Sequence, residues 1–333
     1  MPTHTHNFAG TSRPTVTVGL PVYNGEKSLA QAIESILAQT YRDFELVICD
    51  NASTDHSPDI CREFARRDPR VRFFQTKRNF GAARNFNRTL ELARGKYFRW
   101  HAHDDVAAPT YLEKCVQTLD EHPEVALVYP RRQYMTVDGR PMRNEEFWLD
   151  ANAHASLHDM TFDRLLDIHS SYFVVMEFGL MRTETLRQTG RMGAYITADA
   201  VLLPELLFRG RFHEIPEILF YQRVHEETEE YAVRRTKRGE ANFMNPDHQP
   251  WLLLPGLKIN WELAIAIHNA PLSTSQKWSH WHRQIAHLWP RLRKLLGLRS
   301  FLGKLWLEWR WSTEKPTSGR GVKQHQIRGG IGA

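Results

Sequence analysis

The sequence has few cysteines, and their spacing disfavours a metal site built on thiolates. Cys49, Cys61 and Cys115 are the three in 333 residues, and no CxxC pair occurs among them. Zinc sites of that kind need closely spaced pairs of cysteines. A small, odd number of cysteines is also typical of proteins in a reducing compartment. We therefore expect a protein without a thiolate zinc site that works in such a compartment.

Long apolar segments are absent as well. No run of 18 apolar residues occurs, and the polar start MPTHTHNFAGTSRP lacks the apolar core of a secretory signal. The sequence therefore predicts a cytoplasmic protein without a membrane-spanning helix. The formal charge of +6 is mild. It suits anionic partners such as nucleotide phosphates or an anionic membrane surface, but it gives no support for binding to nucleic acid.

The glycine-rich nucleotide-binding motifs are missing too. The segment PVYNGEKS, residues 21–28, follows the first apolar run and is neither GxGxxG nor GxxxxGK. A dinucleotide-binding fold and a P-loop therefore have no support. A nucleotidyltransferase is disfavoured because the glycine- and arginine-rich loop of such enzymes is absent. No GxSxG nucleophile elbow appears either.

What the sequence does contain is a regular alternation of apolar patterns. Short apolar runs predict strands at 16–20, 44–49, 71–75, 97–102 and 125–130. Apolar residues three and four apart predict helices between them, and a further helix beginning near Asp199. This rhythm favours an α/β fold with a mostly parallel central sheet and helices on both faces. Residues 212–225 are expected to form a short strand pair.

Polar residues follow the predicted strands where ligands bind in such sheets, at the carboxyl ends. Asp50 and the pair Asp104-Asp105 come at the ends of the second and fourth strands. Neighbouring carboxylates repel each other unless a cation lies between them, and oxygen ligands suit Mg²⁺ or Mn²⁺. The alternative is that these residues cap turns and helices. His101 and His103 share a strand face, and for them packing is favoured over metal binding.

The order of these motifs resembles the inverting glycosyltransferases of family 2, over about residues 16–225. The resemblance rests on six pieces in order: Pro21-x-Tyr23-Asn24 with Glu26 and Leu29, Ser35-x-x-x-Gln39-Thr40, Asp50-Asn51-Ala52-Ser53-Thr54-Asp55, Asn79-x-Gly81-x-Ala83-Arg84-Asn85, Gly95-Lys96-Tyr97 leading to Asp104-Asp105 and Pro109, and Arg223-x-His225. It implies the GT-A fold. It also implies transfer of a sugar, with inversion, from a nucleotide-sugar donor, for which a UDP sugar is the family's commonest choice. The acceptor would be a glycan or a lipid-linked molecule, as in polysaccharide biosynthesis.

The resemblance also implies roles for single residues. The donor nucleotide would lie against six residues: Pro21, Tyr23, Glu26, Asp50, Arg84 and Asp104. Asp104 would hold Mn²⁺ or Mg²⁺ at the diphosphate, with His225 as a second metal ligand. Asp199 would be the general base that accepts the acceptor's proton, and Asp105 would stand beside the sugar. Without the resemblance, Asp199 would be taken as a first-turn residue that stabilises its helix.

Three positions depart from the family pattern. Ala102 stands where the first aspartate of the DxD motif is usual, Asn51 where a second aspartate is common, and Ala198 where a glutamate precedes the base. These changes leave Asp104, Asp105 and Asp199 in place. They also leave open an alternative, a catalytically lapsed glycosyltransferase-like protein that binds glycans or partner proteins.

The C-terminal part differs in composition. Eight of the ten tryptophans lie beyond residue 250, and residues 277–311 contain eight Lys or Arg and one Glu. We expect a flexible segment over 1–14, a GT-A domain over 15–235, a helical extension over 250–311 and disorder over 312–333. Basic residues with Trp and Leu favour a helix in a membrane interface, placing the protein peripherally on the inner face of the cell membrane. The alternative is a helix that packs on the domain.

Overall fold

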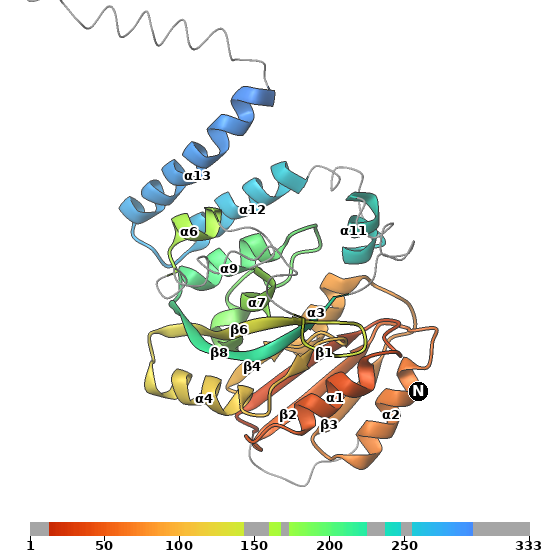
Figure 1. Cartoon of the computed structure of the whole chain (residues 1–333). Helices are drawn as coiled ribbons and strands as arrows, with labels where there is room; N and C mark the ends of the chain where they lie inside the picture. The colour runs from red at the N-terminus through yellow and green to blue at the C-terminus, as the bar shows by residue number, and fades with distance from the viewer. Residues whose placement is uncertain (1–12, 143–159, 168–172, 225–236, 248–254, 296–333) are drawn as a thin grey trace, which may run out of the picture. The chain divides into compact units, whose positions relative to one another are not determined.

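The computed structural model describes residues 13–142, 160–167, 173–224, 237–247 and 255–295 (Figure 1). Its contacts divide the chain into two units, Met1–Arg283 and Gln284–Ala333. The first unit contains the sheet. The second is described only where helix α13 (Thr274–Leu295) continues into it. The predicted boundaries at 15–235 and 250–311 remain predictions.

A mixed sheet forms the centre of the first unit. Among the described residues its strand order is β3-β2-β1-β4-β7-β6-β8-β5. The strands are β1 (Val16–Val22), β2 (Phe44–Asp50), β3 (Val71–Gln75), β4 (Tyr97–Trp100), β5 (Val106–Ala107), β6 (Val125–Met135), β7 (Leu180–Arg182) and β8 (Arg211–Arg223). Strands β1 to β4 are parallel to one another, whereas β7 runs antiparallel to β4 and β6. The five strands predicted from apolar runs are confirmed as β1, β2, β3, β4 and β6. Of these, β1, β2 and β4 are buried along their whole length.

The expected strand pair over 212–225 is wrong. Residues 211–223 form the single strand β8, which lies parallel to β6. The ladder pairs Pro130 with Ile215 and then Arg131 with Ile218, so residues 216 and 217 bulge between these pairs. Pro216 has no N–H to give to the ladder, and a bulge removes that need without ending the strand. The proline therefore marks an irregularity rather than the turn of a hairpin.

Helices cover both faces of the sheet. They are α1 (Leu29–Leu37), α2 (Ser57–Arg67), α3 (Ala82–Glu91), α4 (Tyr111–Glu121), α6 (Phe162–Asp167), α7 (Phe173–Glu177), α8 (Thr183–Arg187), α9 (Asp199–Leu207), α11 (Lys237–Met244) and α12 (Pro255–Asn269). Figure 1 shows α1, α2 and α4 on one face and α3, α7 and α9 on the other. In the part of the chain that the structure describes, no helix is both long and apolar enough to cross a bilayer.

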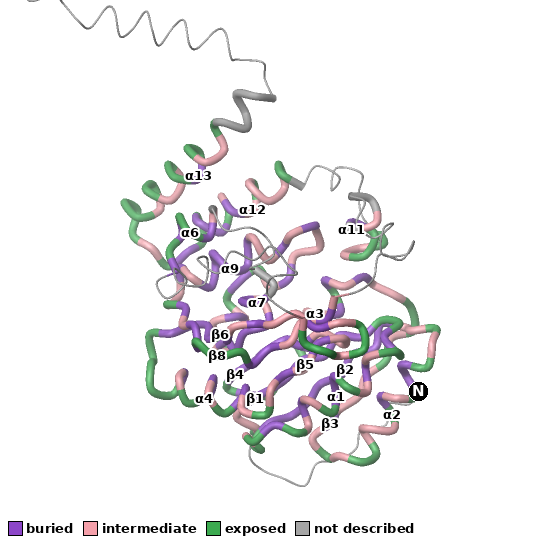
Figure 2. The backbone as a smooth tube through the Cα atoms, viewed as in Figure 1, coloured by how far each residue is buried: buried purple, intermediate pink, exposed green. Residues whose placement is uncertain are grey.

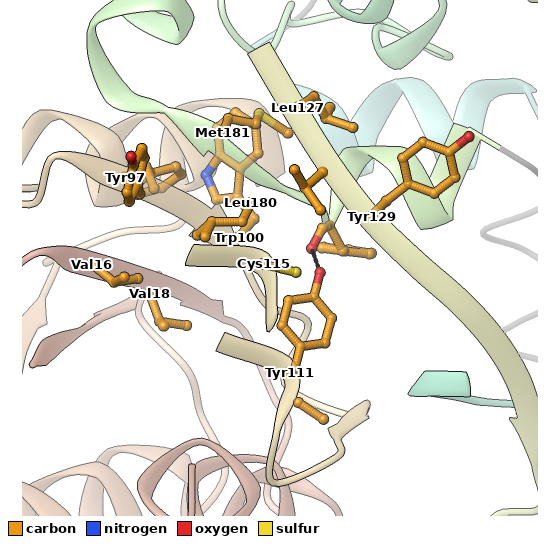
Figure 3. Close-up of a cluster of buried hydrophobic side chains, with 14 of the residues drawn as sticks. Val16, Val18, Tyr97, Trp100, Tyr111, Cys115, Leu127, Tyr129, Leu180 and Met181 are labelled. Atoms are coloured by element: carbon orange, nitrogen blue, oxygen red, sulfur yellow. Dashed lines mark hydrogen bonds between the residues drawn. The ribbon is translucent and has the colours of Figure 1, made fainter. Parts of the chain in front are cut away.

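The core lies between the sheet and these helices, where the strands are buried and the outer helix faces are exposed (Figure 2). Neighbouring residues of β4 point to opposite faces. The Trp100 indole N–H lies 3.0 Å from the carbonyl of Phe86 in α3, whereas the Arg99 guanidinium lies over the ring of Tyr111 in α4. Figure 3 shows Tyr111 within this core, where its hydroxyl donates to the carbonyl of Phe178 at 2.8 Å. Buried hydroxyl and indole groups are thus paired, as the low-polarity interior requires.

Candidate active site

The loops after β1 and β2 are joined by hydrogen bonds between backbone and side chain. Asn24, with a positive φ of 51°, accepts the Thr54 N–H at 2.9 Å and donates its own N–H to the Ser53 hydroxyl at 2.9 Å. Glu26 accepts the His56 N–H at 2.9 Å. The two loops therefore form one rigid edge at the carboxyl ends of their strands. Tyr23 is 39% exposed at this edge, and Pro21, two residues earlier, is buried in β1.

Asp50 lies at the floor of this edge. Its side chain is fully buried, and its Oδ2 accepts the Ser53 N–H at 3.2 Å. Its other oxygen, Oδ1, is buried and has no hydrogen-bond partner in the structure. An unpaired buried carboxylate oxygen costs about 1–3 kcal/mol or more. The geometry therefore favours a ligand that brings an N–H or O–H group to Asp50.

Two asparagines hold the surrounding loops, and the sequence did not single out this role for either. Asn51 donates to the Asn79 side chain at 2.8 Å and accepts the Phe80 N–H at 3.0 Å. Asn85 donates to the carbonyls of Cys49 at 2.8 Å and Val22 at 3.3 Å. An amide can donate and accept at once, which a carboxylate cannot do. Asparagine at position 51 therefore fits its place, although the family pattern often has aspartate there.

The loop after β3 contributes Arg84. It is exposed at the start of α3, and its guanidinium lies 4.9 Å from the centre of the Phe80 ring. Because Asn51 fixes Phe80, the arginine is held near the edge formed by the first two loops. A phosphate group at this edge would have a cation within reach.

Asp104 and Asp105 lie on the loop after β4, and they differ in environment. Asp104 is partly exposed, whereas Asp105 is 3% exposed and its Oδ1 accepts the backbone N–H of Arg223 at 2.9 Å. Burial, and then the neighbouring charge of Asp104, raises the pKa of Asp105 well above its usual value. The Arg223 side chain in turn donates from Nε to the Asp104 carbonyl at 2.8 Å. Asp105 and Arg223 therefore join the loop to β8, and Asp104 is the more exposed of the two carboxyls.

The first loop and the Asp104 loop also touch. A Cβ atom placed on Gly25 would lie 2.3 Å from the ring of His103. Any larger residue at position 25 would require the His103 side chain to move. The loops that carry Asp50 and Asp104 are thus joined through the first loop, which contacts both of them.

His101 packs in the core rather than binding metal, as the sequence favoured. Its Nδ1 lies 3.1 Å from an Arg99 nitrogen and its Nε2 lies 3.1 Å from the carbonyl of Asp105. Arginine can only donate and a carbonyl can only accept, so these partners require the neutral ring with the proton on Nε2. Burial, with the positive charge of Arg99, lowers the pKa of His101 to about 3, in agreement with a neutral ring.

Few of the described residues other than His101 are candidates for binding a metal ion. The described residues contain no group of three or more His, Cys, Asp or Glu side chains placed to hold a metal. His225, the second predicted ligand, lies outside the described residues. Mg²⁺ is usually bound by one or two carboxylates together with substrate phosphates and water. Asp104 fits such a site, in which most of the ligands come from a bound diphosphate.

Asp199 begins helix α9, as predicted. Its Oδ1 accepts the N–H of Ala200 at 3.0 Å, and its side chain is partly buried. Burial raises the pKa of Asp199 to about 6, and the backbone hydrogen bond opposes part of this rise. A carboxyl with a pKa near neutrality can exchange a proton with a substrate.

A surface cavity of about 460 Å³ lies at the other end of the strands. It is lined by residues next to the starts of β1 and β4 and by α8, among them Arg94, Lys96 and Arg187. Arg94 pairs with Glu45, Lys96 with Asp120, and Arg187 with Glu184. None of the predicted site residues line it. Three of its five cationic residues are therefore paired with carboxylates, and we do not assign it to the site.

Comparison with known proteins agrees with this fold. Residues 17–190 match the family described as Glycosyl transferase family 2. EpsE of Bacillus subtilis, whose own assignment as a glycosyltransferase is provisional, is 40% identical over 112 residues, 33% of this chain and 40% of EpsE. The glycosyltransferase GlyG of Streptococcus pneumoniae is 28% identical over 181 residues, 52% of this chain and 58% of GlyG. The chain thus spans less than two thirds of the length of these relatives.

Among solved structures, TarS 1-349 of S. aureus in complex with UDP-GlcNAc is similar, with a TM-score of 0.58 at 17% identity. The alignment covers 87% of this chain and 77% of the TarS chain. The fold is therefore the α/β sheet of the GT-A class. Since the family match covers more than half of the 333 residues, the chain belongs to glycosyltransferase family 2.

Proposed function

We propose that this protein transfers a sugar from a nucleotide-sugar donor to a hydroxyl of a glycan or lipid-linked acceptor, with inversion and with assistance from Mn²⁺ or Mg²⁺. The observation that supports this most directly is Asp50. Its buried, unpartnered Oδ1 at the carboxyl edge of the sheet suits the N–H and O–H groups of a nucleoside. Tyr23 and Arg84 flank it with an aromatic face and a cation, which suit a base and a phosphate. TarS was solved with UDP and with UDP-GlcNAc, and a UDP sugar is our proposed donor here as well.

The chemistry follows from the charges that develop. When the sugar leaves, negative charge builds on the diphosphate, and a divalent ion supplies Lewis-acid stabilisation there. Asp104 would hold that ion, with His225 as the proposed second ligand. Asp105 and Arg223 keep the Asp104 loop attached to β8, so in this proposal Asp105 acts by fixing Asp104 beside the sugar.

Asp199 is the proposed general base. An acceptor hydroxyl must lose its proton as its oxygen attacks the anomeric carbon, and a carboxylate in reach accepts it. Attack on the face opposite the leaving diphosphate inverts the anomeric centre in one displacement. The raised pKa of Asp199, about 6, makes it a better proton acceptor than an ordinary aspartate while leaving it ionised at neutral pH.

The donor can be tested by thermal shift. We expect one nucleotide sugar, at about 100 times its Kd and with Mn²⁺, to raise Tm by about 5 °C. Asp104→Asn should lose the Mn²⁺-dependent part of the shift, because the ligand to the ion is gone. The matched control is Asp59→Asn, an exposed carboxylate of α2 paired with Arg62. If no nucleotide stabilises the wild type, or if Asp104→Asn responds to Mn²⁺ as the control does, the proposal is wrong.

We also propose that helix α12 binds an anionic membrane surface, close to lipid-linked or surface acceptors. One face of α12 packs Leu263 and Ile267 against Phe162 and Phe208. The opposite face presents Leu257, Trp261 and Ile265, which are 65%, 66% and 38% exposed, and Trp278 of α13 is 60% exposed. Tryptophan is enriched at membrane interfaces, and the basic segment 277–311 adds attraction to anionic lipid.

This second proposal predicts a loss of binding to vesicles. We expect wild type to sediment with vesicles containing about one third anionic lipid, and Trp261→Ser to bind about tenfold more weakly, because a large apolar side chain no longer enters the interface. The control is Val137→Ser, an apolar residue that is 47% exposed elsewhere in the first unit. Equal sedimentation of the two variants, or none by the wild type, would reject the proposal.

A further inference from the structure

The cavity at the other end of the strands, of about 460 Å³, gathers positive charge from three segments of the chain. Its cationic lining residues are Arg13, Arg94, Lys96, Arg182 and Arg187. Glu184 is the one acidic residue among the described residues in the lining. A concave surface with charges of one sign raises the local concentration of ions of the other sign. The cavity is therefore a candidate anion site, separate from the proposed active site.

Hydrogen bonds and ring contacts hold the segments of this cavity together. Thr183, the first residue of α8, donates its N–H to the Lys96 carbonyl at 3.1 Å and its hydroxyl to the Gly95 carbonyl at 2.7 Å. The Lys96 ammonium and the Arg182 guanidinium lie 4.7 and 5.7 Å from the centre of the same Tyr97 ring. The fold therefore brings two of the cations to one place, although they are far apart in the sequence.

The ion pairs of the cavity leave part of its positive charge in place. Glu45, the partner of Arg94, is shared with Arg72 at 2.8 Å. Arg13 is exposed, and among the described residues it has no ion pair or hydrogen bond. Arg182 donates from Nε and Nη2 to backbone carbonyls, which are uncharged, and these bonds do not use its Nη1. Arg13 and Arg182 therefore keep their charge and have donors for a ligand.

The lining indicates which anion suits the cavity. No aromatic residue occurs among its described lining residues, so a nucleotide base would have no ring on which to stack. None of the large exposed apolar side chains of the described residues lies there, so the acyl chains of a lipid would not be covered. The volume is in the range of small-molecule sites. Guanidinium groups match the oxygens of a phosphate, which they can bind through two hydrogen bonds.

We propose that this cavity binds a small, soluble phosphate compound without a base, such as pyrophosphate or a sugar phosphate, with Arg13 and Arg182 as its main ligands. Arg94, Lys96 and Arg187 add attraction at longer range. The lining residues lie next to the starts of β1 and β4, whereas the proposed donor site lies at the carboxyl ends of the same strands. The two ligands therefore do not compete, and this site does not depend on the proposed sugar transfer.

The test is calorimetric titration of the full chain with inorganic pyrophosphate in EDTA, which removes the divalent ions needed for diphosphate at Asp104. We expect one site per chain. Arg13→Gln should weaken binding about tenfold, the loss of a hydrogen bond between charged groups, and Arg13→Glu should abolish it. Because Arg13 has no partner among the described residues, Tm should stay unchanged. The matched control is Arg66→Gln, which removes the same charge from an exposed arginine of α2 paired with Glu63.

A second comparison distinguishes this cavity from the proposed active site. Arg84→Gln should bind pyrophosphate as wild type does. Binding that is lost in Arg84→Gln and kept in Arg13→Gln would place the anion at the active site and overturn the inference. No binding by wild type, or an equal loss in Arg66→Gln, would do the same, since the latter is an effect of net charge alone.

Vesicles containing phosphatidic acid test a lipid headgroup as the source of the phosphate. Sedimentation with these vesicles that depends on Arg13, without binding of pyrophosphate, would reject a soluble ligand. Arg13→Gln should show the same thermal shift as wild type with a nucleotide sugar and Mn²⁺. Failure of the pyrophosphate titration therefore leaves the proposed function standing.

Discussion

Asp199→Asn is expected to lower kcat for sugar transfer about 10³-fold, within the range that a general base contributes, while leaving nucleotide-sugar affinity within about twofold. Asparagine keeps the size of the side chain and can still accept the Ala200 N–H, so the start of α9 is preserved. What is lost is the site that accepts the acceptor's proton. Measurements of single-turnover sugar transfer and of nucleotide-sugar binding check the predicted loss of rate and the predicted unchanged affinity.

The same substitution should change the pH dependence. Because the pKa of Asp199 is raised to about 6, wild-type activity should fall as pH decreases through 6, and the residual activity of Asp199→Asn should lack this fall. The free energy of unfolding changes with pH in the opposite direction to the activity. The folded state binds the Asp199 proton more tightly than the unfolded chain does, so the stability of the wild type decreases as pH rises from 3.8 through about 6. Above that window Asp199→Asn should be at least as stable as wild type.

The outcomes of these experiments distinguish an active glycosyltransferase from a catalytically lapsed binding protein. A wild type that binds a nucleotide sugar but transfers or hydrolyses none of it supports the catalytically lapsed alternative. An Asp199→Asn variant as active as wild type shows that another group is the base. Loss of activity together with a lower Tm above pH 7 would show that Asp199 is structural.

The fold was largely predictable because its evidence is local. Runs such as FELVIC, residues 44–49, are buried on both faces of the sheet, and buried strands have no polar alternation to obscure them. The positions of Asp50, Asp104 and Asp199 followed from the same pattern, since Asp50 ends β2, Asp104 lies on the loop after β4 and Asp199 begins α9. The strand at 211–223 was predicted wrongly because a bulge around Pro216 has the same local composition as a turn.

The hydrogen bonds that hold the site together were not predictable, because they join residues far apart in the sequence. Asn51 and Asn85 could have been noted as polar residues next to strand ends, but their partners lie 28 to 63 residues away. The different burial of Asp104 and Asp105 likewise follows from Arg223, which lies more than 100 residues further along the chain.

We therefore expect the proposed site to be sensitive to substitution of Arg223. It is 5% exposed, and its guanidinium donates to the carbonyls of Asp104, Thr136 and Val137 and to the Gln31 side chain. A lysine has three donors on one atom and cannot reach these partners, which surround the planar group on several sides. Buried carbonyls would lose their donors, and the Asp104 loop would lose its attachment to β8.

We expect Arg223→Lys to lower kcat/KM about 100-fold, the scale of a misplacement of about 1 Å in a catalytic group, and to remove the Mn²⁺-dependent thermal shift. The matched control is Arg182→Lys. Arg182 also donates to three backbone carbonyls, those of Leu119, His122 and Val125, but at the end of the sheet away from Asp104. Both variants should unfold at a lower temperature, and only Arg223→Lys should lose nucleotide binding. If the two lose stability and activity in the same proportion, Arg223 acts on the fold alone, and the attachment of the Asp104 loop to β8 has no separate part in the reaction.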